Sequence, residues 1–297
     1  MSQPVEERRL MRQSPKVIRF GAPTVGFAYG CVVALTSTSH HAAAMWLVWA
    51  TFAVAASTAS GALFVYGLNR WHELNRLSAV QVHDVVWPVA TLAGISLALM
   101  NVTEFPPGPA HSGRDGLGAG LVGMFAILAA IPGAGALFGI WRVASRDVLP
   151  GTRGQQVDML LALRRLLQRM LAAAGSVVAL TTFSAGTWWL LEHSLGTPYG
   201  HRPPQFVLVF GAYGSLIVGV VYGPAWTALQ RRGRVLCEEM YPLRELDQQD
   251  AILSRAADRQ KLEQILGLDQ SMISDLQGGL VILAPLLASA VAAFLPH

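Results

Sequence analysis

Seven apolar runs constrain this chain more than any other feature of its sequence. Each is close to the roughly 20 residues that a helix needs to cross a bilayer, and none has an Asp, Glu, Lys, Arg or His in its interior. The runs predict an all-α, polytopic membrane protein with seven transmembrane helices. They cover residues 20–39, 45–68, 85–103, 117–141, 171–191, 206–229 and 276–295.

The composition agrees with a membrane protein. Hydrophobic residues make up 53% of the chain and charged residues 13%, whereas a soluble domain carries roughly 25% charged residues. The chain has two cysteines, Cys31 and Cys237, which is too few for a disulfide framework or a Cys-based zinc site. The net charge of +4 reflects where the basic residues lie in the loops, so we infer no nucleic-acid binding.

Basic residues give the orientation, because Lys and Arg are retained on the cytoplasmic side of a membrane. Residues 1–19, 69–84, 142–170 and 230–275 hold every Lys and Arg except Arg114 and Arg202. This distribution predicts a cytoplasmic N-terminus and a C-terminus outside. The excess of Arg over Lys and the abundance of Ala, Gly, Leu and Val indicate a GC-rich bacterial genome, so we expect a multi-pass protein of the bacterial plasma membrane.

The predicted organisation has four parts. Residues 1–19 form a basic cytoplasmic tail, 20–229 form the first six spans, 230–275 form a cytoplasmic helical segment, and 276–297 form the seventh span and the C-terminus. The sixth span passes without a stop into Gln230, so its helix is expected to continue out of the membrane. Residues 155–170 have apolar residues on one side, which suits a helix at the inner interface or an extension of the fifth span.

A second cytoplasmic helix is predicted at residues 251–266, with Gly267 as a left-handed cap. Its apolar residues recur at approximately helical spacing, and they are buried either on the fifth and sixth spans or between protomers. The helix is therefore where we expect any cytoplasmic partner. The apolar residues are Ile252, Leu253, Ala256, Leu262, Ile265 and Leu266.

Pairs of glycines four residues apart occur in three of the spans. Small residues at this spacing let helix backbones approach closely, so these pairs predict helix packing. Together with the cytoplasmic helix they favour a homo-oligomer. The pairs are Gly26 with Gly30, Gly135 with Gly139, and Gly219 with Gly223.

The uncharged spans argue against a carrier that uses a carboxylate in the middle of the membrane, since such groups usually mark ion and proton pathways. Pro132 and Gly133, in the middle of a span, form a candidate hinge. We find no nucleotide loop, haem attachment motif or nucleophile elbow. No catalytic residue and no cofactor is predicted, and an enzyme is disfavoured.

Histidines gather at the predicted outer face. His40 and His41 lie between the first two spans, and His193 and His201 flank the last outer loop beside Glu192. If these side chains converge, protonation near pH 6.5 or a shared metal ion would act through them. The alternative is that they are ordinary boundary residues with no common site.

Three classes of function remain open. The first choice is an oligomeric channel or pore, because a passive conduit needs no charged site in the middle of the membrane. The second is a membrane scaffold or accessory subunit of a larger assembly, with the cytoplasmic helix as its docking surface. A transporter or a lipid-modifying enzyme ranks third. The lipid bilayer is the partner that the composition itself implies.

Overall fold

The computed structural model describes residues 15–37, 44–77, 82–104, 117–146, 150–196, 205–242 and 249–269. Within these residues the protein has seven helices and no strand, which confirms the all-α class. The helices are α2 (Pro15–Thr36), α3 (Ala44–Leu77), α4 (Val82–Glu104), α5 (Leu117–Ala144), α6 (Arg153–Ser194), α7 (Gln205–Met240) and α8 (Gln249–Leu266).

The chain is built as a multi-pass membrane protein. Four helices are long and apolar enough to cross a bilayer: α3, α5, α6 and α7. Two shorter apolar helices, Gly21–Thr36 and Val85–Ala98, correspond to the first and third predicted spans. The seventh predicted span, 276–295, lies outside the described residues, so the total of seven spans and the orientation remain predictions.

Helices α3 and α5 form the centre of the bundle. Helix α3 packs on α2, α5 and α6, while α5 also packs on α4, α6 and α7. A large buried apolar cluster contains side chains from each of the helices α3 to α8, among them Ile140, Leu163 and Leu236. A smaller cluster near the other end surrounds Trp49 and Trp188, whose ring centroids are 4.4 Å apart.

Glycines bring α2 onto α3 at backbone distance. A Cβ atom on Gly30 would lie 2.7 Å from the Cα of Val54, and one on Gly26 would lie 3.0 Å from the carbonyl carbon of Ser57. Distances this short leave no room for a side chain, because the opposing atoms belong to a helix backbone. These two predicted packing glycines therefore lie at a close helix contact.

The crossing of α3 and α5 depends on a different glycine. A Cβ atom on Gly67 would lie 2.5 Å from the backbone nitrogen of Gly133 and 2.8 Å from the carbonyl carbon of Pro132. Helix α5 continues through both of these hinge candidates. Further along α5, a Cβ on Gly139 would collide with the side chain of Leu74.

Helices α6 and α7 continue well beyond their apolar runs. Helix α6 has 42 residues and begins with a capping box formed by Thr152 and Gln155, while α7 has 36 residues. At 1.5 Å per residue they are about 63 and 54 Å long, against roughly 30 Å for the hydrocarbon core. The structure thus confirms that the helix of the sixth span continues past Gln230. Of the two placements predicted for residues 155–170, it shows the extension of the fifth span, because these residues are the first turns of α6.

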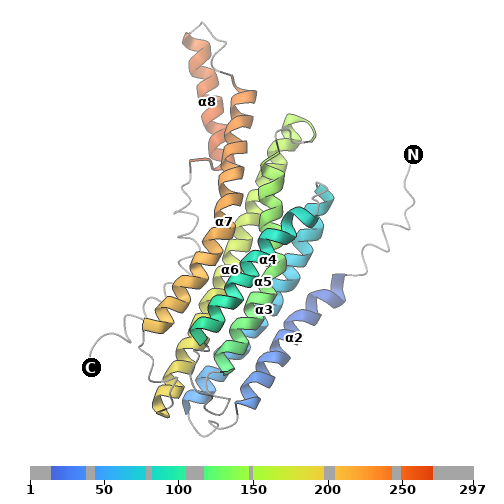
Figure 1. Ribbon diagram of the computed structural model, residues 1–297. Coiled ribbons are helices and arrows are strands. Elements are labelled where there is room, and N and C mark those ends of the chain that lie inside the picture. Colours follow the sequence, from blue (N-terminus) through green and yellow to red (C-terminus); the bar gives the residue numbers. More distant parts are fainter. Residues whose placement is uncertain are drawn as a thin grey trace, which may run out of the picture.

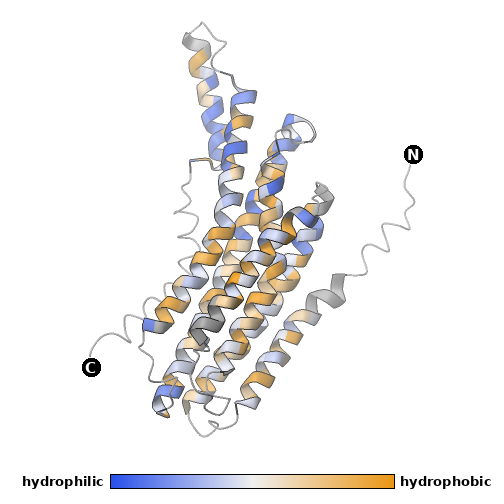
Figure 2. Ribbon diagram, viewed as in Figure 1, coloured by the Kyte–Doolittle hydropathy of each residue, from blue (hydrophilic) through white to orange (hydrophobic). Residues whose placement is uncertain are grey.

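Beyond the apolar runs, α6, α7 and α8 form one assembly with a polar surface and a buried apolar interior, which we call the stalk (residues 153–170, 230–240 and 249–268). Helices α7 and α8 project past the rest of the bundle at this end (Figure 1). Hydrophilic residues gather here, whereas the middle of the bundle is hydrophobic (Figure 2). The sequence assigns this end to the cytoplasm.

Candidate functional site

A partly open cavity of about 170 Å³ lies in the apolar part of the bundle. Its wall runs along α5 over residues 123–137, along α6 over 170–182 and along α7 over 210–221, with further side chains from α3 and α4. The stretch on α6 is about 18 Å long at 1.5 Å per residue. We call this elongated cavity the groove.

Helices α4 and α7 both contribute side chains to the groove wall. Both pack on α5, but they make at most marginal contact with each other. Their outer surfaces carry exposed apolar side chains, including Trp87 and Ile95 on α4 and Leu216 and Val220 on α7. Both of these helices therefore contribute to the groove wall and also carry exposed apolar side chains.

Eight of the lining residues are Ala or Gly, and the lining is almost entirely apolar. Some of these small residues pack against large side chains of a neighbouring helix, since a Cβ on Gly133 would lie 3.0 Å from Met170 and one on Gly214 would lie 2.9 Å from Val178. The small lining residues are Ala93, Gly123, Ala126, Ala130, Gly133, Ala134, Ala174 and Gly214.

Four lining side chains carry a hydroxyl group: Ser96, Thr181, Thr182 and Tyr213. The first three donate to carbonyl oxygens of their own helices, over 2.7, 2.9 and 2.8 Å respectively, so their protons are not available to a ligand. The hydroxyl of Tyr213 is buried and has no hydrogen-bond partner among the described residues. The Tyr213 hydroxyl is therefore a buried donor that no described residue uses.

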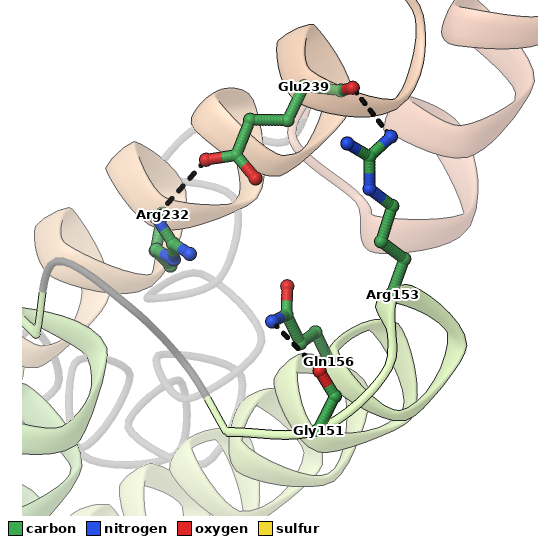
Figure 3. Close-up of polar contacts among 5 residues, drawn as sticks. All are labelled: Gly151, Arg153, Gln156, Arg232 and Glu239. Carbon is green, nitrogen blue, oxygen red and sulfur yellow. Dashed lines mark hydrogen bonds and ion pairs between the residues drawn. The ribbon is translucent and has the colours of Figure 1, made fainter.

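A second polar group joins α6 to α7 in the stalk (Figure 3). Arg153 donates through Nη1 to the backbone carbonyl of Glu239 over 2.8 Å, and the Glu239 carboxylate lies 3.8 Å from Nη1 of Arg232. Arg232 is only 8% exposed, and a charge buried this deeply needs a partner. The Gln156 amide donates to the carbonyl of Gly151 over 3.4 Å. The start of α6 is thus tied to the last turns of α7.

Arg164 ties α8 to α6. Its Nη1 donates to the carbonyl of Leu266 in the last turn of α8, and Gly267 has the predicted left-handed conformation with φ +62°. Leu262 and Leu266 are buried against the bundle. Leu253 and Ile265 are 63% and 62% exposed. Part of the predicted apolar surface is therefore buried on the stalk, and part is left uncovered.

Helix α8 also carries an ion pair of its own. Arg259 Nε donates to the Glu263 carboxylate over 2.9 Å, one helical turn away. This hydrogen bond is the main reason that the pKa of Arg259 is raised above its ordinary value. Both side chains are about a third exposed, so water screens the pair and its contribution to stability is small.

Glu192 and His193 lie at the opposite end of α6. Glu192 is fully buried, whereas His193 is exposed and stacks on the Trp189 ring with 5.2 Å between centroids. Among the residues that the structure describes, no group of three or more His, Cys, Asp or Glu could hold a metal ion. His40, His41 and His201 lie outside those residues, so a shared pH-sensing or metal site remains a prediction.

The other predicted site residues occupy varied surroundings. Gly133 lies in the groove wall, where a Cβ would meet the Met170 methyl carbon at 3.0 Å. A Cβ on Gly135 would make ordinary contacts of 3.9 Å with Trp71 and Val85. A Cβ on Gly219 would meet open space. Gly219 therefore makes no close helix contact within the described part of the protomer. Its partner in the spacing pattern, Gly223, is half-buried on the same helix.

Comparison with models of protein families, with curated proteins and with solved structures gives no match for this chain. Its function therefore has to be argued from the stalk and the groove. Sequence reasoning missed the groove and Tyr213. The one feature of the sequence that could have indicated the groove was the high density of Ala and Gly in α5. It did not do so because the same composition is also expected where helices pack closely.

Proposed function

We propose that the protein is a membrane scaffold or accessory subunit of a larger assembly, whose stalk holds a water-soluble partner at the cytoplasmic face of a bacterial plasma membrane. The observation that carries this proposal is that α8 is fixed to the bundle while some of its apolar side chains stay exposed. Arg164 and the buried Leu266 fix α8 to α6 and α7, while Leu253 and Ile265 remain largely exposed on a helix outside the hydrocarbon. A fixed helix with uncovered apolar side chains is suited to bind a partner at little entropic cost.

The way in which the stalk is built also favours this role. Helices α6 and α7 continue from the bilayer into the stalk without a break, and the contacts of Arg153 and Arg232 with Glu239 join their ends (Figure 3). A partner bound at α8 would therefore be held at a defined distance and angle from the membrane.

An oligomeric channel is the second candidate. The groove of one protomer is lined almost entirely by apolar side chains, and ions need polar groups or backbone carbonyls to replace their water. A conduit would therefore have to run between protomers. The exposed membrane face of α7, which includes Leu208, Val209 and Leu216, leaves room for such an assembly.

The proposed orientation predicts the labelling of Ser254→Cys, an exposed position on α8. In a background with Cys31 and Cys237 replaced by Ala, a membrane-impermeant maleimide should react with this cysteine in inside-out vesicles and not in intact cells. Labelling of intact cells would invert the topology and place the stalk outside.

The scaffold predicts a specific contact at α8. A photo-crosslinking amino acid at position 253 or 265 should give an adduct of one defined mass in native membranes. The same amino acid at Asp158, an exposed position of the stalk on α6, serves as the control and should give none. Leu253→Asp with Ile265→Asp should abolish complex formation without changing the melting temperature, because both side chains are exposed.

The competing channel makes the opposite prediction. Purified protein in liposomes should show no ion flux across pH and voltage if it is a scaffold. The channel would replace the scaffold as the proposed function if two results were found together. The Leu253→Asp, Ile265→Asp protein would conduct ions, and no crosslinked partner would be detected.

A further inference from the structure

We propose that the apolar run 276–295 of the same chain packs against an uncovered face of α7 inside the membrane, in line with the place where α8 packs on that helix. This face carries Ala212, Ser215 and Gly219. The run lies outside the described residues, so the proposal rests on α7, on the end of α8 and on the length of chain that follows. It does not depend on the scaffold function.

Helix α7 is the least covered of the four long apolar helices. Only 11% of its most apolar stretch is buried, against 44–50% in α3, α5 and α6. Ala212 and Ser215 are exposed, and a Cβ atom on Gly219 would meet nothing within 4 Å. Small residues such as these let a second helix approach closely. This face of α7 is therefore suited to contact with another helix.

The same face of α7 is already covered in the stalk. Residues 212, 215, 219, 226, 230 and 233 follow one another at intervals of three, four or seven residues, so they share one side of the helix. Trp226, Gln230 and Gly233 line a small space together with the end of α8. A Cβ on Gly233 would lie 2.6 Å from the side chain of Leu268. The interface between α7 and α8 therefore continues along one face into the uncovered residues.

The chain leaves α8 close to the point where this uncovered face begins. Gly233 is four residues beyond the apolar run 206–229, which is about 6 Å along the helix axis. Leu268 lies beside Gly233, so the chain after α8 starts near the expected membrane boundary. Residues 269–276 reach about 24 Å at most when fully extended. The run 276–295 therefore has to enter the membrane near α7.

The length of the run suits one crossing antiparallel to α7. Its 20 residues would give a helix of about 30 Å, which matches the hydrocarbon core of a bilayer. If residue 276 is level with residue 229, Leu286 is level with Gly219 and Ala290 is level with Ser215. A leucine side chain of the run would then fill the open space at Gly219, as close packing requires.

A second copy of the chain is a poorer occupant of this face. A few residues connect the run to α8, and a short flexible linker of this kind gives an effective concentration of about millimolar. Contact within one chain also avoids most of the translational and rotational entropy that two separate molecules lose when they associate. Contact between two protomers is an outcome that the following test separates.

Disulfide crosslinking of the full-length protein in native membranes tests the proposal. Cys31 and Cys237 are replaced by Ala, and Gly219→Cys is introduced where its side chain meets open space. A second cysteine is then placed at each position from 283 to 290 in turn. Crosslinking should peak every three or four positions and be lost between them, because such positions share a helix face. The crosslinked product should have the mass of one chain.

Two control experiments show whether the contact is specific. Val32→Cys on α2 replaces a side chain that is 57% exposed, but α2 packs on α3 and α5, so the same scan should give no product. Gly219→Leu fills the open space and should prevent the crosslink between Ser215→Cys and Ala290→Cys. Gly94→Leu, which adds the same side chain to open space on α4, should leave that crosslink unchanged. The melting temperature of each variant shows that it remains folded.

Products that all have the mass of two chains would overturn the proposal and assign this face of α7 to a second protomer. Absence of a product at every position from 283 to 290 would also overturn it, as would equal crosslinking to Gly219→Cys and Val32→Cys. Crosslinking without a helical period would overturn it too, because the run would then pass α7 without packing on it.

Discussion

Gly67→Ala is expected to lower the melting temperature of the purified protein by about 6 to 12 °C. The added carbon would lie 2.5 Å from the backbone nitrogen of Gly133 and 2.8 Å from the carbonyl carbon of Pro132, and neither atom can rotate away. Helices α3 and α5 must therefore separate at the centre of the bundle. Overpacking of this kind costs about 3 kcal/mol, and each kcal/mol lowers the melting temperature by about 2–4 °C.

Gly94→Ala on α4 is the matched control, since a Cβ there would meet nothing within 4 Å. This substitution should leave the melting temperature unchanged or raise it slightly, because Ala favours a helix over Gly by about 1 kcal/mol. Equal losses for Gly67→Ala and Gly94→Ala would show that the α3–α5 crossing does not depend on the small size of Gly67. Thermal unfolding in one detergent, followed by light scattering and circular dichroism, compares the two.

The helices were predictable because length and apolar composition are local properties of the sequence. The runs at 45–68, 117–141, 171–191 and 206–229 reappear in the four helices that can span a bilayer. Their ends were less well defined. Residues 155–170 were compatible with two placements, and only packing of Leu160, Leu163 and Leu167 into the bundle core makes them the first turns of α6.

Close helix contacts could be predicted only in part. Spacing identified Gly26 and Gly30, which do lie against the backbone of α3. Gly219 belongs to a pair with the same spacing, but a Cβ there would meet open space. The α3–α5 crossing depends instead on Gly67, which has no glycine four residues away in the sequence. Spacing shows which residues share a helix face, but the partner of that face is a tertiary property.

The groove could not be predicted for a related reason. The void is lined by side chains from five helices, so no single segment of sequence encodes it. Tyr213 looks like an ordinary aromatic residue within a span, and its hydroxyl becomes informative only because the structure gives it no partner. The absence of charged residues from the spans also removed the usual sequence signal of an intramembrane site.

Gly267→Ala is expected to release α8 from the stalk. Gly267 has φ +62°, which costs a residue with a side chain about 1–2 kcal/mol. A Cβ there would also lie 2.6 Å from the guanidinium carbon of Arg164, displacing the group that donates to Leu266. A hydrogen bond from a charged group contributes about 1.5–3 kcal/mol. The two costs together are about 2.5–5 kcal/mol, so amide hydrogen exchange in α8 should accelerate about 60- to 4,000-fold, since each 1.4 kcal/mol is a factor of about ten.

Two further variants separate the causes of this release. Gly196 has φ +68° and nothing within 4 Å of a Cβ, so Gly196→Ala imposes the backbone penalty alone and should affect only the end of α6. Arg164→Met removes the donor without straining the backbone and should reproduce most of the acceleration in α8. Adding Gly267→Ala to Arg164→Met should then contribute only the backbone penalty, because the two changes act on one contact. If the two effects were instead fully additive, Gly267→Ala would not act by displacing Arg164. An unchanged exchange rate in Arg164→Met alone would show that Arg164 does not hold α8 in place.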